Sequence, residues 1–177
     1  MHIKKLYLCI AFIYISFGVI KSQDIAKKTN TLYAEIAGIS GTPISIQYDR
    51  IINKKENYLV DVTMGFGYFQ FSKNWNPIIG FPISLNFANG QFNHHFEFGI
   101  GLTYNSGMPQ QKIEDFPAES EKAFWATLRL GYKYQKPEGG LFIRAGFTPL
   151  IKIKQYSVLA EETNFLPLLG LGIGYTF

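Results

Sequence analysis

Residues 94–105, with the sequence HHFEFGIGLTYN, alternate between two kinds of side chain. Successive side chains of an extended strand point to opposite sides, so one face of this segment carries only aromatic and aliphatic residues. These residues are Phe96, Phe98, Ile100, Leu102 and Tyr104. The opposite face carries polar residues and glycines, namely His95, Glu97, Gly99, Gly101, Thr103 and Asn105. The pattern predicts a β-strand with one apolar face and one polar or very small face.

The same alternation recurs along the chain. We expect eight extended segments, at residues 31–39, 44–52, 58–71, 81–87, 94–105, 123–135, 140–151 and 166–177. The composition agrees with many strands, because 16% of the residues are aromatic and only 17% are charged. The sequence therefore predicts an all-β protein.

Alternation alone does not say which face points inward. A soluble barrel or sandwich hides its apolar face, whereas a membrane barrel exposes it to lipid. Here the non-apolar face is rich in glycine at regular positions, which suits the crowded interior of a narrow barrel: Gly65, Gly67, Gly99, Gly101, Gly131, Gly146, Gly170, Gly172 and Gly174. This favours an up-and-down antiparallel transmembrane β-barrel of about eight strands. Glycines that mark bulges in a soluble sheet are the alternative.

The N-terminus resembles an export signal. His2, Lys4 and Lys5 precede an apolar run at residues 6–20, which is short for a membrane-spanning helix. We expect a cleaved signal peptide at residues 1–22, a short N-terminal segment at 23–30 and one barrel domain at 31–177. Cleavage would remove Cys9, the only cysteine, and would leave 14 basic against 13 acidic residues. The pI near 9.0 is then no argument for nucleic-acid binding.

The lengths of the connections give the barrel a predicted orientation. The even-numbered connections, at 53–57, 88–93 and 136–139, are short, as periplasmic turns are. Three of the four others, at 40–43, 72–80, 106–122 and 152–165, are long, as external loops are. The acidic loop 106–122 is the best candidate for an external interaction surface.

The final strand carries a known type of signal. Leu171, Ile173, Tyr175 and Phe177 alternate with glycine and threonine, and the chain stops on Phe177. The segment resembles the terminal strand of outer-membrane barrel proteins, which the barrel-assembly machinery reads, so Tyr175 and Phe177 are the candidate assembly signal.

Three further stretches resemble a family of small, largely uncharacterised outer-membrane β-barrel proteins of Gram-negative bacteria. The first stretch combines residues 33–35 with residues 45–50, the second is residues 82–87, and the third is residues 140–149. The resemblance implies an outer-membrane location in contact with lipid, but it implies no activity. We expect a monomer without a cofactor, metal site, catalytic residue or nucleic-acid partner.

Seven charged residues fall on the predicted inner face. The acids lie on the first, second, third and fifth segments and the bases on the sixth and seventh: Glu35, Asp49, Asp61, Glu97, Arg129, Lys133 and Arg144. Buried charges are costly unless they are paired, so the pattern predicts a salt-bridged plug. A gated ion path is the alternative. His94 and His95 face opposite ways and cannot hold one metal ion together; His95 is expected to pair with Glu97.

Two other functions stay open. A conduit or binder for small hydrophobic molecules would need an apolar pocket near the external end, which Phe69, Phe71 and Trp125 are placed to line. A lipid-modifying enzyme would need an activated nucleophile, but Gly38-Ile39-Ser40-Gly41 only superficially matches a nucleophile elbow. The first hypothesis is a non-enzymatic barrel that acts structurally or through its external loops.

Overall fold

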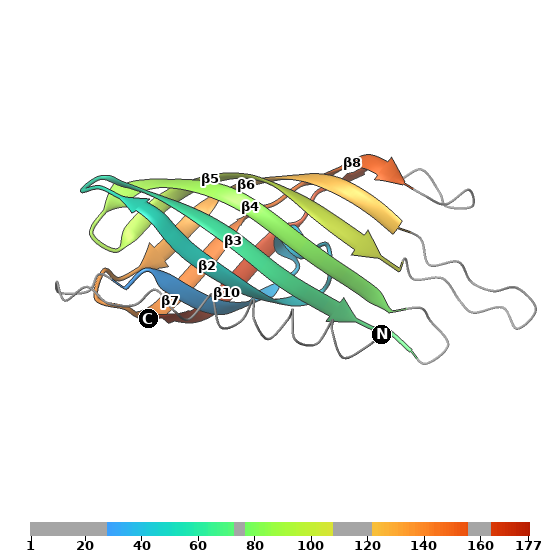
Figure 1. The fold of residues 1–177 in the computed structure, drawn as a ribbon, viewed down its shortest axis with the longest axis horizontal. Helices are drawn as coiled ribbons and strands as arrows, with labels where there is room; N and C mark the ends of the chain where they lie inside the picture. The colour runs from blue at the N-terminus through green and yellow to red at the C-terminus, as the bar shows by residue number, and fades with distance from the viewer. Residues whose placement is uncertain (1–27, 73–76, 108–121, 156–163) are drawn as a thin grey trace, which may run out of the picture.

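The strands close into one antiparallel barrel, shown by a computed structural model that describes residues 28–72, 77–107, 122–155 and 164–177. The ten strands are β1 (Asn30–Ile36), β2 (Ile44–Lys54), β3 (Tyr58–Phe69), β4 (Ile78–Gln91), β5 (His94–Ser106), β6 (Lys122–Gln135), β7 (Gly140–Phe147), β8 (Leu150–Gln155), β9 (Phe165–Leu166) and β10 (Leu169–Thr176). From β1 to β7 each strand pairs with the next one in sequence. β8 pairs with β6 and β9, and β10 pairs with β7 and with β1, which closes the ring (Figure 1). The described residues contain no helix that is long and apolar enough to cross a membrane.

The ten strands occupy eight positions round the barrel, each called a wall here, because two of the walls are formed by an interrupted strand. The predicted strand at 140–151 divides into β7 and β8 around Pro149, and the one at 166–177 divides into β9 and β10 around Pro167. Proline has no backbone N–H to donate to a ladder. β6 continues past the first break and pairs with both β7 and β8. The prediction of about eight walls is therefore confirmed, with two breaks that the alternation pattern did not show.

The ends of the barrel differ. At one end, here called the turn end, short turns at 55–57, 92–93 and 136–139 join the strands, and the pair Asn30 and Phe177 lies there, with Phe177 N donating to Asn30 O at 2.7 Å. The other end, the loop end, carries the remaining connections. The turn between β4 and β5 is shorter than expected, because Asn89 and Gly90 belong to β4. The reversal takes place at Phe92 and Asn93, and a Cβ on Gly90 would overlap the backbone of His94.

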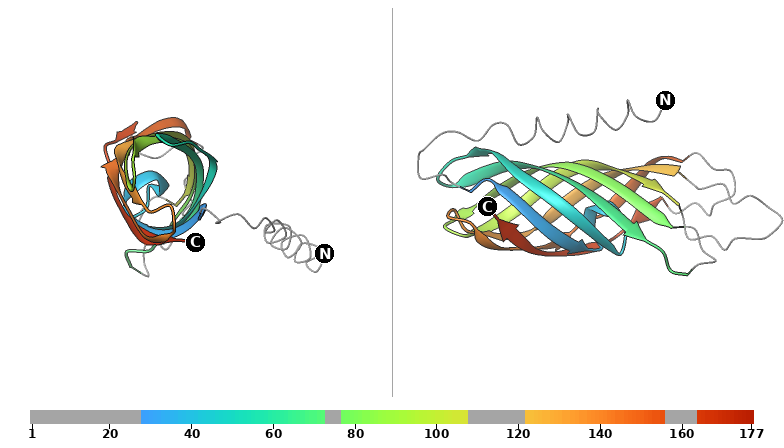
Figure 2. Two further views of the ribbon diagram at one scale, coloured as in Figure 1. Left: turned by 90° about the vertical axis from the view of Figure 1, so that its left-hand side faces the viewer. Right: turned by 60° about the horizontal axis from the view of Figure 1, so that its bottom comes forward.

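The first connection at the loop end folds into the lumen. Residues 38 and 39, predicted as strand, form with Ser40 the 3₁₀ helix η1 (Gly38–Ser40), whose residues are buried. Figure 2 shows η1 (blue) inside the ring of strands. Gly38 has φ 79°, and a Cβ there would lie 2.5 Å from the carboxyl carbon of Glu35. A residue without a side chain is therefore required for this inward bend.

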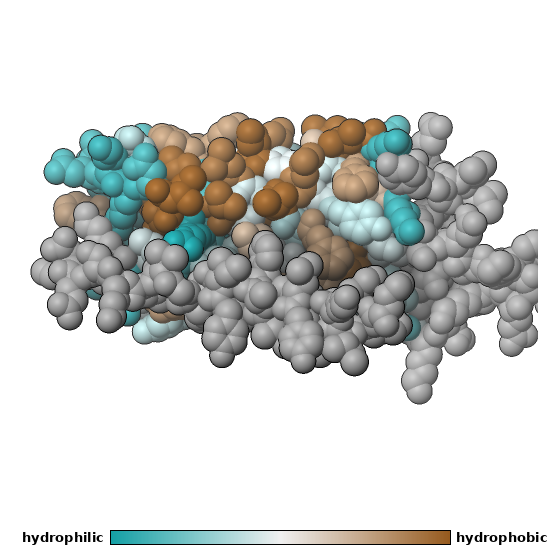
Figure 3. Space-filling model, viewed as in Figure 1, coloured by the Kyte–Doolittle hydropathy of each residue, from teal (hydrophilic) through white to brown (hydrophobic). Residues whose placement is uncertain are grey.

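The apolar faces of the strands point outward. Large aliphatic and aromatic side chains on every wall are exposed, among them Ile46 at 60%, Phe96 at 63% and Ile173 at 62%. In Figure 3 the hydrophobic surface lies between hydrophilic ends. Aromatic rings follow one another round the loop end of this band, where Tyr104 lies 6.4 Å from Phe81 and 5.1 Å from Phe124 between ring centroids. The exterior suits a hydrocarbon environment rather than water.

The small face points inward, as predicted. A Cβ on Gly65 would overlap the Gln47 side chain, and one on Gly99 would overlap Asn86. Polar side chains on the same face, such as Thr63 and Thr127, are buried. The lumen is therefore filled by side chains, as expected for an eight-stranded wall.

Candidate functional site

The seven charged residues predicted for the inner face all lie inside the barrel, and none is more than 1% exposed. They come from six strands that the closed barrel brings round one lumen. Lys133 on β6 and Arg144 on β7 are neighbours in register, and their side chains cross the lumen to acids on β2, β3 and β5.

Five of these residues form one cluster. Lys133 Nζ donates to Asp49 Oδ2 at 2.9 Å and to Asp61 Oδ2 at 2.5 Å. Arg144 Nη2 donates to the same Asp49 oxygen at 3.0 Å and to Glu97 Oε1 at 2.5 Å. Asp49 therefore lies between the two cations. Hydrogen bonds between ionised groups are among the strong ones when water is excluded.

The remaining two charges pair with each other. Arg129 Nη2 on β6 donates to Glu35 Oε1 on β1 at 2.7 Å. Both side chains are at most 2% exposed. This pair lies next to η1, because the Glu35 carboxylate is close to Gly38.

Neutral residues that the sequence reasoning did not select complete the network. Arg144 Nη1 donates to the hydroxyl of Tyr33, and Asn86 Nδ2 donates to Asp61 Oδ1 at 2.6 Å and to Thr63 Oγ1 at 2.9 Å. Their inward parity on β1, β3 and β4 is visible in the sequence. What the sequence did not show is that their side chains reach the charged groups.

Polar contacts also hold η1 in place. Thr103 Oγ1 donates to the carbonyl of Ile39 at 2.5 Å, and Asn105 Nδ2 donates to the carbonyl of Ser40 at 2.9 Å. Ile39 is 1% exposed. Both donors lie on β5, opposite in the ring to the strands that carry η1. The loop-end part of the lumen is thus occupied by backbone of the chain itself.

The predicted upper pocket is not assembled from its three residues. Trp125 is buried and packs in a cluster with Ala123 and Leu150. Phe69 is half-buried. Phe71 lies beyond the end of β3 and is 76% exposed, so its predicted inward position is wrong: the strand ends at Phe69, and the inward-outward alternation ends with it.

The two adjacent histidines face opposite sides, but the expected pair of His95 with Glu97 is wrong. Glu97 bonds to Arg144, and His95 Nδ1 is buried without a hydrogen-bond partner among the described residues. His94 is exposed on the outside, where its Nδ1 lies 2.6 Å from the Tyr132 hydroxyl. In the described ranges, no three His, Cys, Asp or Glu residues are grouped to hold a metal ion.

The C-terminal strand closes the ring, and the two residues of the predicted assembly signal face outward. Tyr175 and Phe177 are exposed on the outer face at 61% and 47%, and β10 pairs with β1 from Leu171 to Thr176. The acidic segment of the predicted external loop, at 108–121, and the predicted signal peptide lie outside the described residues.

The fold is similar to that of the N-terminal β-barrel domain of Pseudomonas aeruginosa OprF, known from a crystal structure. The two share 15% sequence identity at a TM-score of 0.56, over 85% of this chain and 98% of that one. No protein-family model matches the sequence, and no curated protein matches it. The likeness and the apolar exterior together identify the fold as a closed antiparallel transmembrane β-barrel with eight walls.

Proposed function

We propose that the protein is a non-enzymatic outer-membrane β-barrel with a closed lumen, which acts as a structural element of the membrane or through its external loops. The observation that carries this proposal is the lumen itself. A cluster of five charges, a separate ion pair and the inward-folded η1 occupy it one after another.

An outer-membrane location is supported by the kind of fold. Barrels that span a membrane with strands have an apolar exterior and a polar interior, and this chain has both. The turn end, where the first strand of the barrel begins and the last strand ends, would then face the periplasm. The exposed Tyr175 and Phe177 on the strand that closes the ring would be read by the barrel-assembly machinery. A monomer in contact with outer-membrane lipid agrees with a ring in which all strands are paired.

The cost of moving the charges supports a closed lumen. For an ion to pass, Arg144 would have to leave Asp49 and Glu97, and η1 would have to leave Thr103. Breaking a buried ion pair by removing one partner costs about 3–5 kcal/mol. Wide aqueous channels belong to barrels with more strands.

The alternative of a hydrophobic conduit has less support. Ala123 and Leu150 occupy the space around Trp125 that a ligand would need. The remote alternative of a lipid-modifying enzyme would need a serine set up for attack. The hydroxyl of Ser40 instead lies 2.8 Å from that of Thr42.

Two measurements test the proposal. Membrane fractionation with a heat-modifiability gel should place the protein in the outer membrane as a folded form of altered mobility; a soluble form without a mobility shift would contradict it. Purified protein in a planar bilayer should show no steady single-channel conductance. Discrete, lasting conductance steps would show that the lumen is open.

A further inference from the structure

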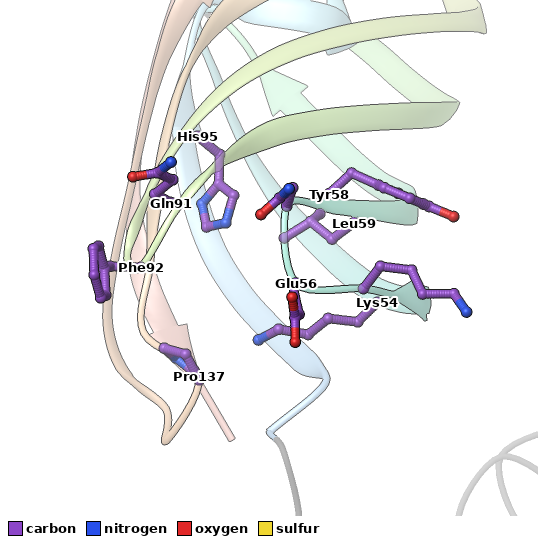
Figure 4. A pocket seen from close by; sticks show the side chains of 10 residues that line it. Lys54, Glu56, Tyr58, Leu59, Gln91, Phe92, His95 and Pro137 are labelled. Carbon is purple, nitrogen blue, oxygen red and sulfur yellow. The ribbon is translucent and has the colours of Figure 1, made fainter.

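The turn end of the barrel contains a pocket of about 610 Å³ that the proposed function does not use. Its lining includes Lys54, Lys55, Leu59, Phe92, His95 and Pro137. These residues come from three turns and the strand ends beside them (Figure 4). The pocket therefore lies where the lumen meets the aqueous phase.

The floor of the pocket is apolar. Leu59 is 1% exposed and packs with Ile51 and Ala88 in a small hydrophobic cluster from β2, β3 and β4. Leu59 lies two residues before Asp61 on the same inward face of β3, so this cluster lies between the pocket and the charged lumen. A ligand that enters from the turn end meets a hydrophobic surface before it meets the charges.

His95 supplies one ring nitrogen, Nδ1, that has no hydrogen-bond partner among the described residues. The side chain is 7% exposed, and Nδ1 makes no hydrogen bond within the described part of the chain. Figure 4 shows the imidazole ring directed into the pocket. A buried polar atom without a partner costs free energy that a bound ligand can recover. An imidazole nitrogen can donate to a carboxylate or accept from an amide N–H, according to its tautomer.

Phe92 lies at the rim of the pocket with an unfavourable backbone conformation. Its φ is 57°, a left-handed value that is unusual for a bulky residue, and its side chain is 86% exposed. An exposed ring adds little to the stability of the fold. The two-residue turn between β4 and β5 accounts for this backbone conformation and places the ring at the rim of the pocket.

The charges of the rim favour an anion. Lys54 and Lys55 outnumber Glu56 among the ionised side chains that line the pocket. Lys54 pairs in register with the lumenal Leu59 and is half-buried, which places it on the inner side of the rim. A carboxylate near these lysines would gain charge-assisted hydrogen bonds.

We propose that this pocket binds the C-terminus of a peptide that ends in an apolar residue. The terminal carboxylate would lie near Lys54 and Lys55, the apolar side chain would lie on Leu59, and the last amide or the carboxylate would bond to His95. The proposal does not depend on a closed lumen, because the pocket lies outside the charged cluster.

A pair of small probes tests the carboxylate directly. N-acetylphenylalanine and its amide differ in one charged group, and each is titrated into the barrel in detergent micelles while the ring signals of ¹⁵N-labelled histidine are followed by NMR. The acid should shift the His95 signal saturably and bind at least about tenfold more tightly than the amide, because one such interaction is worth a factor of this order. His94, on the outer face, is the internal control and should not shift.

Variants separate the parts of the pocket. Replacing both lysines, as Lys54→Gln with Lys55→Gln, should remove the preference for the acid over the amide. Glu56→Gln should strengthen binding of the acid.

Three results would overturn the proposal. An unchanged His95 signal with the acid would show that the pocket does not bind it. Equal shifts of His94 and His95 would show partition of the probe into the micelle. Tighter binding of octanoate than of N-acetylphenylalanine would assign the pocket to a fatty acid rather than to a peptide end.

Discussion

Arg129 and Glu35 lie 94 positions apart in sequence, yet their side chains meet at 2.7 Å inside the barrel. In the described part of the chain, Glu35 is the only carboxylate within ion-pair distance of Arg129. Lys133 and Arg144 each form ion pairs with more than one carboxylate. The stability of the barrel should therefore depend more on Glu35 than on any single acid of the larger cluster.

Glu35→Gln should lower the free energy of unfolding by about 3–5 kcal/mol, because it leaves the buried Arg129 charge without an anion. The measurement is denaturant unfolding in micelles, followed by the loss of the folded gel band. Glu138→Gln, in an exposed turn at the turn end, is the matched control and should change stability by less than about 0.5 kcal/mol. Equal stability of the two variants would contradict the assigned role of the ion pair.

Asp49→Asn should cost less than Glu35→Gln, by about 2 kcal/mol or more. The described lumen holds four acids against three bases, so this change brings the ionisable groups to equal numbers. Asp61 still contacts Lys133, and Glu97 still contacts Arg144. The same unfolding measurement compares the two variants, and a larger loss for Asp49→Asn would refute the account based on charge number.

Gly174→Val should prevent closure of the barrel. A Cβ at this position would overlap the carbonyl oxygen of Leu32 and the Cβ of Tyr33 on the paired strand β1. The backbone of β1 would have to move, since both contacts lie at or next to its main chain. The assay is the yield of heat-modifiable protein after refolding. Ala34→Val adds bulk on the exposed outer face of the same strand pair and should refold normally.

The two ends of the barrel should differ in their access from outside the cell. The sequence has a single cysteine, Cys9, in the predicted signal peptide. Lys122→Cys places an exposed thiol at the loop end, and Lys55→Cys places one at the turn end. A membrane-impermeant maleimide should label the first in intact cells and the second only after lysis. The reverse pattern would invert the orientation inferred from the connection lengths.

The sequence by itself determined the faces of the strands. Because side chains alternate along an extended chain, the outward position of Phe96 and the inward position of Glu97 follow from parity alone. The glycines identified the inner face, because they also alternate with apolar residues along single strands and therefore share one face. The seven lumenal charges could thus be named before any contact was known.

Tertiary structure decided which of these groups meet. Arg129 pairs with Glu35, and Glu97 pairs with Arg144 rather than with His95, because closure of the ring sets the register between strands that are distant in sequence. The inward turn of η1, the breaks at Pro149 and Pro167 and the exposed position of Phe71 also depend on where each wall ends. Alternation is a property of one strand, whereas the contents of the lumen are a property of the closed barrel.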